Sequence, residues 1–348
     1  MRIRGVHRAQ QALRWLKRRV VGAAVVLVYH RVADLISDPW SLSVSLRCFE
    51  EHLRVLRSRF RPISLADLTR ALQSQSVPPR SVALTFDDGY ADNLYHAKPL
   101  LEQYNIPATV FVTTGCLGGD REFWWDELDK LLLQPSQLPE SLRLRLDGEA
   151  HEWRVDGATR YEEQDCLRYR RWRAWEEPPT PRHHLYYSLW QLLQRSSDAE
   201  RQAVLHDLAS WAGIDRRARS THRSLTVDEL RTLAQSDGLD VGAHTMSHTV
   251  LATLPGTEQQ EEIFRSKQFL EQILKRPVTA FAYPYGKPSD YTGETMAIVE
   301  HLGFTAACTN VPGLVSSGVN YYELPRVHAH DWDGEEFFSR VTQEFDRG

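Results

Sequence analysis

Two adjacent carboxylates, Asp87 and Asp88, stand where an apolar run of the sequence ends. The run covers residues 82–86, and Gly89 follows the two acids as at a tight turn. A strand this apolar is usually buried, and an unpaired buried carboxylate is costly. The acids should therefore lie at the carboxyl end of the strand, where a cation can satisfy them, and they are candidates for acid–base chemistry or metal binding. If Asp87-Asp88-Gly89 is considered by itself, the alternative is an ordinary Asp-Gly turn in which one of the two acids is a cap.

Two histidines, His244 and His248, follow a second short apolar run, residues 239–243. In a helical turn, their i, i+4 spacing would put both imidazoles on one side, within reach of one ion. One carboxylate and two histidines leave a fourth position open on a tetrahedral zinc ion, and a hydrolytic metal needs that open position. A His-x-x-x-His pattern on its own more often belongs to surface or helix-packing residues. Together with Phe-Asp-Asp-Gly at another strand end, it becomes strong evidence for a metal site.

A third apolar run, residues 278–282, leads into the sequence Tyr-Pro-Tyr-Gly at residues 283–286. Pro284 restricts the chain, and Gly286 permits a tight turn. The segment is therefore suited to present a backbone N–H and an aromatic wall to whatever binds at the metal.

The three motifs, in this order, closely resemble those of the polysaccharide deacetylases, carbohydrate esterase family four. The resemblance covers about residues 82–119 and 224–345. It implies removal of an N-acetyl group with the help of one divalent metal ion, most often Zn²⁺, with Co²⁺, Ni²⁺ or Mn²⁺ as alternatives. It makes Asp87 the general base. The metal ligands that it implies are Asp88, His244 and His248.

The same resemblance implies an oxyanion donor and a general acid. The donor would be the backbone N–H of Tyr285, which follows Pro284 in the third motif. The acid would come from a Leu-x-His motif near the C-terminus, where this chain has two histidines. We favour His328, because it would share a strand face with Arg326, and His330 is the alternative acid.

The chain departs from the family pattern in two places. The arginine that normally precedes Pro-Tyr-Gly by two residues is Ala282 here, and the Asp-x-x-Asp-Trp motif is not in its usual place. Instead, Asp331-Trp332 follows the two histidines. Since the family's arginine orients and ionises the base, we expect Arg326 to donate to Asp87 in its stead.

Between the motifs, short apolar runs alternate with helical patterns. Helices are expected over residues 46–57, 64–72, 90–104, 226–235, 257–274, 292–301 and 335–345, and further strands over residues 20–29, 108–113 and 304–308. Parallel strands with crossover helices, and every motif at the carboxyl end of a strand, predict an α/β fold of the (β/α) barrel type. The resemblance implies the family's distorted seven-stranded (β/α) barrel.

We expect residues 25–348 to form a single domain. Within it, the alternation of strands and helices is interrupted by a largely helical insertion, residues 120–223. The insertion shows helical patterns at residues 126–133, 186–195 and 199–212, and a possible hairpin of residues 142–146 against 152–155. It also holds most of the chain's ten tryptophans, which either stack on sugar rings or pack among the insertion helices. The segment Glu122-Phe123-Trp124-Trp125 follows the strand end at residues 113–115, so we expect this segment to wall the cleft, with Trp124 as a substrate contact.

The N-terminal residues 1–24 read as a basic leader. The apolar run 20–29 carries no cleavage signal and is too short to span a bilayer, so we interpret it as the first strand. His30 follows this strand and should lie near the site mouth as a substrate contact, unless it is a satisfied strand-end histidine. The basic residues either make peripheral contact with an anionic membrane or form a solvated leader.

Composition limits the possible functions. A chain of 348 residues with 42% hydrophobic content can bury a barrel-sized core. A net charge of −4 argues against a nucleic-acid partner, whose binding domain would be basic. The four cysteines are far apart, which predicts reduced thiols and a cytoplasmic protein, with the periplasm as the alternative.

The leading hypothesis from sequence is therefore a metal-dependent hydrolase that removes N-acetyl groups from an amino sugar in a surface polysaccharide or its precursor. Two alternatives stay open. One is a hydrolase of another acyl or non-peptide C–N bond, since the same site attacks any accessible carbonyl. The other is a catalytically silent barrel that binds glycans.

Overall fold

The computed structural model describes residues 22–146 and 148–347. Its main sheet is parallel, with the strand order β11-β10-β9-β6-β5-β1-β12, and β4 pairs with β5 outside this path. Its strands are β1 (Ala24–Tyr29), β4 (Arg61–Pro62), β5 (Ser81–Phe86), β6 (Ala108–Val112), β9 (Leu239–Ala243), β10 (Ala280–Ala282), β11 (Ala306–Cys308) and β12 (Val327–His328). The seven strands of the main path form a parallel half-barrel, which confirms the α/β fold class predicted from sequence.

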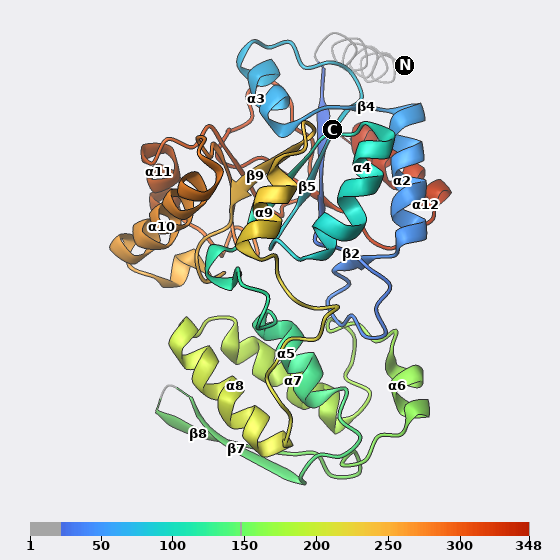
Figure 1. Ribbon diagram of the computed structural model, residues 1–348, viewed down its shortest axis with the longest axis vertical. Helices are drawn as coiled ribbons and strands as arrows, with labels where there is room; N and C mark the ends of the chain where they lie inside the picture. Colours follow the sequence, from blue (N-terminus) through green and yellow to red (C-terminus); the bar gives the residue numbers. More distant parts are fainter. Residues whose placement is uncertain (1–21, 147, 348) are drawn as a thin grey trace, which may run out of the picture.

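Helices connect the strands and pack around the sheet in the upper part of Figure 1. They are α2 (Leu46–Arg59), α3 (Leu65–Gln73), α4 (Lys98–Tyr104), α9 (Val227–Ala234), α10 (Gly256–Leu274), α11 (Gly293–His301) and α12 (Gly334–Arg347), with a π-helical turn, Asn93–Ala97, ahead of α4. Polar caps fix where several of them begin. The side chain of Ser64, for example, accepts a hydrogen bond from the backbone N–H of Asp67 at the start of α3.

The long strands are buried on both faces, as expected for a parallel sheet covered by helices. On β1, Val25, Leu27 and Tyr29 pack into the larger core cluster, while Ala24 and Val26 pack into a second cluster with residues of α3. Alternate residues thus serve two cores. This explains why the strand reads as a continuous apolar run.

The sheet is not closed by a regular strand pair between β11 and β12. Cys308 and Leu324 form an isolated parallel bridge there. The side chain of Arg326 then donates from Nε to the carbonyl of Thr309, at 2.9 Å. The seam of the half-barrel therefore places Arg326 beside the end of β11.

The insertion forms a separate lobe, seen in the lower half of Figure 1, with its own hydrophobic core. Its elements are α5 (Trp124–Leu132), β7 (Ser141–Leu146), β8 (Glu149–Arg154), α6 (Glu163–Tyr169), α7 (Pro181–Leu193) and α8 (Asp198–Ala212). Strands β7 and β8 pair as an antiparallel hairpin. The chain enters and leaves this lobe at one place, because Glu122 and Arg223 form an antiparallel bridge.

Residues 1–21 of the basic leader lie outside the described residues. Within residues 22–146 and 148–347, no helix combines the length and apolar character needed to cross a bilayer.

Candidate active site

The two acids of the first motif lie in the turn after β5. The backbone N–H of Asp87 bonds to the carbonyl of Tyr29 on β1, at 2.9 Å. Asp88 and Gly89 then take left-handed conformations, with φ of 75° and 84°. A positive φ is uncommon for a residue other than glycine, although aspartate tolerates it better than most. The turn thereby brings both carboxylates to the carboxyl end of the sheet, where both are almost fully buried.

Asp88, His244 and His248 meet there as a group whose ligand atoms all lie within 4.8 Å of one another. Oδ1 of Asp88 is 3.6 Å from Nε2 of His244 and 3.3 Å from Nε2 of His248. Among the described residues, this buried oxygen has no hydrogen-bond partner. Burial, followed by the charge of Asp87, raises the pKa of Asp88 well above its usual value in the protein alone. A carboxylate and two imidazoles in this arrangement fit a divalent cation, which would keep Asp88 ionised.

The protein orients the ring of His244 and keeps both imidazoles uncharged. Nδ1 of His244 lies 2.7 Å from the carbonyl of Ala282, so its Nδ1–H donates there and Nε2 faces Asp88. Burial lowers the pKa of both His244 and His248. Both rings are therefore neutral near pH 7, the form that binds a metal ion.

The expected helical turn between the two histidines is wrong. After β9 the chain is irregular, and both Thr245 and His248 are left-handed, with φ of 62° and 52°. Tertiary and local hydrogen bonds hold this loop in place of helical ones. The hydroxyl of Thr245, for instance, accepts the backbone N–H of His248 at 3.1 Å.

Arg326 makes the expected contact with Asp87. Its Nη1 and Nη2 donate to the two carboxylate oxygens at 2.7 and 2.6 Å, and the arginine is fully buried. Burial by itself would raise the pKa of Asp87. The adjacent Arg326 charge, followed by His244, outweighs it and holds that pKa below its usual range. Asp87 is thus an ionised, fixed carboxylate beside the group of Asp88, His244 and His248.

Asn310 is a site residue that the sequence did not indicate. Its Oδ1 accepts from Nη2 of Arg326 at 2.8 Å, and its Nδ2 donates to the carbonyl of Tyr285 at 2.8 Å. It therefore links the arginine that holds Asp87 to the turn of the third motif. The available signal was its position just after β11, where a polar residue again follows a buried strand.

A cavity of about 370 Å³ opens over these groups. Its lining joins barrel and insertion, with aromatic walls above the carboxylates. The lining residues are Trp40, Trp125, Trp190, Tyr285, His30, His328, Leu42, Gln194, Lys287, Asn310, Asp87, Asp88, His244 and His248. The rings of Trp40 and Trp190 lie 4.0 Å apart between centroids, so the loop after β2 (Arg31–Val32) meets α7 over the site.

Trp124 does not wall this cavity, contrary to expectation. Trp125, the next residue of α5, points from a different face of the helix and lines the cavity. Its ring centroid lies 4.8 Å from that of His248. Trp124 instead packs against Trp125 and Trp190. The tryptophans of the insertion thus serve both packing and the cavity wall.

In the third motif, Tyr285 is left-handed, with a φ of 59°. Its ring lies 4.8 Å from that of His248 and lines the cavity, whereas Pro284 does not line it. Among the described residues, no backbone acceptor pairs with the N–H of Tyr285. The turn is closed by Gly286, whose N–H donates to the carbonyl of Pro284 at 2.6 Å.

The three candidate histidines stack in a row. His30 and His328 line the cavity, with their ring centroids 5.7 Å apart. His330 lies outside it, 6.1 Å beyond His328, and its Nδ1 is 3.2 Å from the hydroxyl of Ser41. The structure therefore brings His328 to the site and leaves His330 behind it.

The sequence profile of the family described as "Polysaccharide deacetylase" matches residues 74–138 and 198–307, half of the chain. The chain belongs to the polysaccharide deacetylase family. Residues 139–197, which include the hairpin, α6 and α7, fall in the gap of this match.

Individual relatives agree with the family. YxkH of Bacillus subtilis (strain 168), which carries the name of a polysaccharide deacetylase, is 21% identical over 90% of this chain and 74% of its own. The Streptococcus pyogenes deacetylase PplD, solved in complex with acetate, superposes with a TM-score of 0.56, at 18% identity over 93% of this chain and 98% of that one. IcaB from Ammonifex degensii gives a TM-score of 0.56, at 19% identity over 92% and 97%. These solved structures share the fold of this polysaccharide deacetylase family member.

Proposed function

We propose that the protein is a metal-dependent hydrolase that removes N-acetyl groups from an amino sugar of a surface polysaccharide or its precursor. The observation that carries this proposal is an ionised Asp87, fixed by Arg326, beside the buried group Asp88, His244 and His248 at the floor of an aromatic cavity. Family membership supports a carbohydrate substrate.

Asp88, His244 and His248 would hold the ion, for which we propose Zn²⁺, with Co²⁺, Ni²⁺ or Mn²⁺ as alternatives. When bound, such an ion supplies a Lewis acid that polarises the acetyl carbonyl and makes water more acidic. Asp87 would accept a proton from the attacking water, because it is ionised and held at the same cavity floor. Water oxygen joins the acetyl carbon, the C–N bond breaks, and acetate and a free amine leave.

The other proposed roles follow from position. The backbone N–H of Tyr285 would donate to the oxyanion formed from the acetyl carbonyl. His328 would protonate the leaving nitrogen. Burial and the neighbouring His30 and Arg326 lower the pKa of His328 to about 3, so its ring is neutral in the resting protein. It must gain a proton within the reaction cycle before it can deliver one.

The aromatic walls support a sugar ring as the group that enters. Trp40, Trp125 and Trp190 offer flat apolar faces, while Gln194 and Lys287 offer polar contacts at the same cavity. Sugars have this mixed character, since their C–H faces stack on aromatic rings and their hydroxyls form hydrogen bonds. Cytoplasmic location and peripheral membrane contact through residues 1–24 remain proposals that rest on the sequence alone.

The deciding experiment measures acetate release from N-acetylglucosamine oligomers, with and without a chelator, together with the metal content of the purified protein. The proposal expects release that stops on chelation and returns with Zn²⁺. It also expects His244→Ala and His248→Ala to strip the metal, because two remaining ligands hold zinc poorly. Metal-dependent cleavage of a different acyl or C–N substrate would favour the first alternative. Glycan binding without turnover in the metal-loaded protein would favour the silent barrel.

A further inference from the structure

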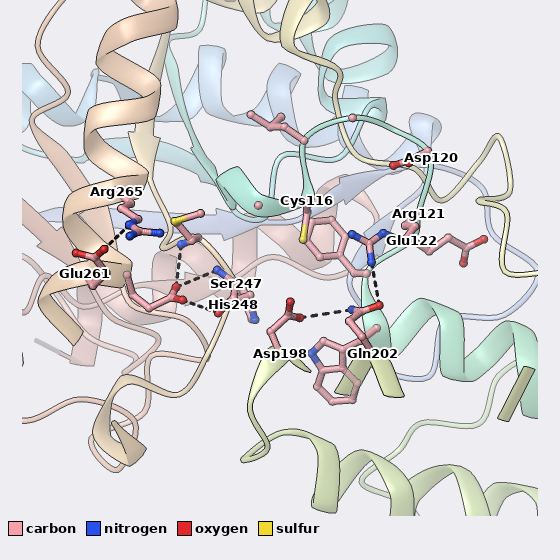
Figure 2. Close-up of a pocket in the computed structure, with 17 residues that line it drawn as sticks. Cys116, Asp120, Arg121, Glu122, Asp198, Gln202, Ser247, His248, Glu261 and Arg265 are labelled. Atoms are coloured by element: carbon pink, nitrogen blue, oxygen red, sulfur yellow. Dashed lines mark hydrogen bonds and ion pairs between the residues drawn. The ribbon is translucent and has the colours of Figure 1, made fainter. Parts of the chain in front are cut away.

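The loop that carries His248 is held on one side by α10. The carboxylate of Glu262 accepts three hydrogen bonds from this loop: from the backbone N–H of Met246 at 3.0 Å, and from the backbone N–H and hydroxyl of Ser247, both at 2.9 Å. Figure 2 shows these contacts beside the labelled Ser247 and His248. One charged side chain thus fixes the N–H groups of the loop.

The insertion holds the same loop from the other side. Arg201 of α8 donates from Nη2 to the carbonyl of Ser247 at 3.2 Å and from Nη1 to the carbonyl of His248 at 3.4 Å. Its side chain is fully buried. The carbonyl groups of the loop therefore depend on a residue of the insertion, which lies outside the barrel.

Arg201 is costly to bury in this way. Among the described residues, its Nε has no hydrogen-bond partner. The ring of Trp124, at 6.0 Å from the guanidinium carbon, adds a weak attraction. Since a buried charged group needs hydrogen-bond partners, the carbonyls of Ser247 and His248 help to compensate the burial of this guanidinium.

A cavity of about 780 Å³, lined by both polar and apolar residues, lies between the two helices that hold the loop. Asp198 and Gln202 of α8 line one side of it, and Glu261 and Arg265 of α10 line the other, with His248 between them in Figure 2. The loop that carries His248 is thus hydrogen-bonded by both the barrel and the insertion, from opposite sides of this cavity.

We propose that Arg201 is a positioning residue for the ligand His248, and that through it the insertion sets the affinity of the metal site. This rests on the proposed function, because it assumes that Asp88, His244 and His248 bind a metal ion. Groups that orient a metal ligand from behind commonly change metal affinity by 10- to 100-fold when they are removed. The hydrogen bonds of Arg201 act on the backbone of the ligand residue itself.

The test compares Arg201→Met with Arg182→Met in the full-length protein. Arg182 of α7 is a matched control, because it is also fully buried and donates to the backbone carbonyls of Pro135, Ala158 and Thr159, all within the insertion. The dissociation constant for Co²⁺ is measured by competition with a chelator, and the visible spectrum of bound Co²⁺ reports ligand geometry. The melting temperature of the metal-free protein reports folding.

The proposal expects Arg201→Met to weaken Co²⁺ binding by about 10-fold or more and to alter the Co²⁺ spectrum. Arg182→Met should lower the melting temperature and leave Co²⁺ affinity and spectrum as in the wild type. Wild-type affinity in Arg201→Met would overturn the proposal, and so would equal losses of affinity in both variants, since the cause would then be loss of the insertion fold.

Arg201→Lys decides the case if Arg201→Met does not fold. It keeps the charge but lacks the planar fork that reaches two carbonyls, so a measurable loss of Co²⁺ affinity supports the proposal and none contradicts it. Failure of the wild-type protein to bind Co²⁺ would instead contradict the proposed function. The two failures are therefore distinguishable.

Discussion

The rings of His30 and His328 lie nearly parallel, with an interplanar angle of 16°. His30 directly follows β1, and His328 is the last residue of the neighbouring strand β12, where it pairs in register with Val28. Burial is the main cause that lowers the pKa of His30 to about 4 and that of His328 to about 3, and the neighbouring His30 ring further disfavours protonation of His328. Two neutral imidazoles therefore face the cavity near pH 7, next to a carboxylate that is already ionised.

His328→Ala should lower kcat by at least about 100-fold across the pH range, because the leaving nitrogen would lose its proton donor. His330→Ala should leave kcat nearly unchanged, since that ring lies behind His328. Steady-state kinetics of both variants across pH checks this. If His330→Ala proves the damaging change, the acid is two residues further along the chain.

Asp87→Asn should keep the metal and lower kcat by about 100-fold or more, because an amide cannot accept the proton from water. Asp88→Asn is the matched comparison, as it should lose metal first. Metal content and turnover are measured on the same samples. Near wild-type turnover of metal-loaded Asp87→Asn would exclude Asp87 as the base.

Arg326→Ala should retain metal, lower the rate and move the acidic limb of the rate profile to higher pH. The sign follows from the pKa of Asp87: Arg326 holds it down against the effect of burial, so removing the cation lets it rise. Asn310→Ala should act in the same direction but more weakly, since it removes one bond to the arginine. An unchanged acidic limb in Arg326→Ala would show that another group controls it.

Trp190→Ala should raise KM for an oligosaccharide on the order of tenfold, with a smaller effect on kcat, because it removes an aromatic face from the cavity wall. Trp211→Ala is the control from the same lobe. Its ring is outside the cavity lining and its Nε1 donates to the carbonyl of Ser141. Equal KM values for the two variants would argue against the tryptophan wall as a sugar-binding face.

The free energy of unfolding should fall in mild acid, partly through His52. Burial lowers the pKa of this fully buried ring to about 4, against about 6.5 unfolded. The folded protein therefore binds fewer protons between these values, and His52 should contribute a loss of about 2 kcal/mol between pH 7 and 5. His52→Gln should flatten this pH dependence in chemical unfolding experiments. The exposed His206 provides the control, and an equal effect of His206→Gln would contradict the assignment.

Much of the barrel could be predicted because its strands are buried on both faces and read as apolar runs; β9 was predicted with both of its ends. The loop after it was not, since the spacing of His244 and His248 suits a helix equally well. Only tertiary contacts, such as those of Glu262, decide for the irregular form. The choice between Trp124 and Trp125 failed for a related reason. A single step along a helix rotates a side chain by about 100°, and composition does not fix that rotation.

Helix α6 was missed because it is short, and no residue in it is buried. The sequence did not distinguish Asn310 from other polar residues, because its role depends on hydrogen bonds to Arg326 and Tyr285, which are distant from it in sequence. Arg326 could be predicted because Ala282 replaces the family's arginine, so another cation has to pair with Asp87. An unmet electrostatic requirement was thus a stronger guide than residue type alone.

The bridge between Glu122 and Arg223 brings together the two chain segments that connect the insertion to the barrel. A segment whose two ends already touch can be exchanged for another of different length without stretching the parts it leaves behind. Such a segment is a natural unit of recombination, and a designer could replace it as a cassette to present a different sugar-facing wall. The exchange would carry one condition, which is that the incoming cassette must bring its own donor for the carbonyls of Ser247 and His248.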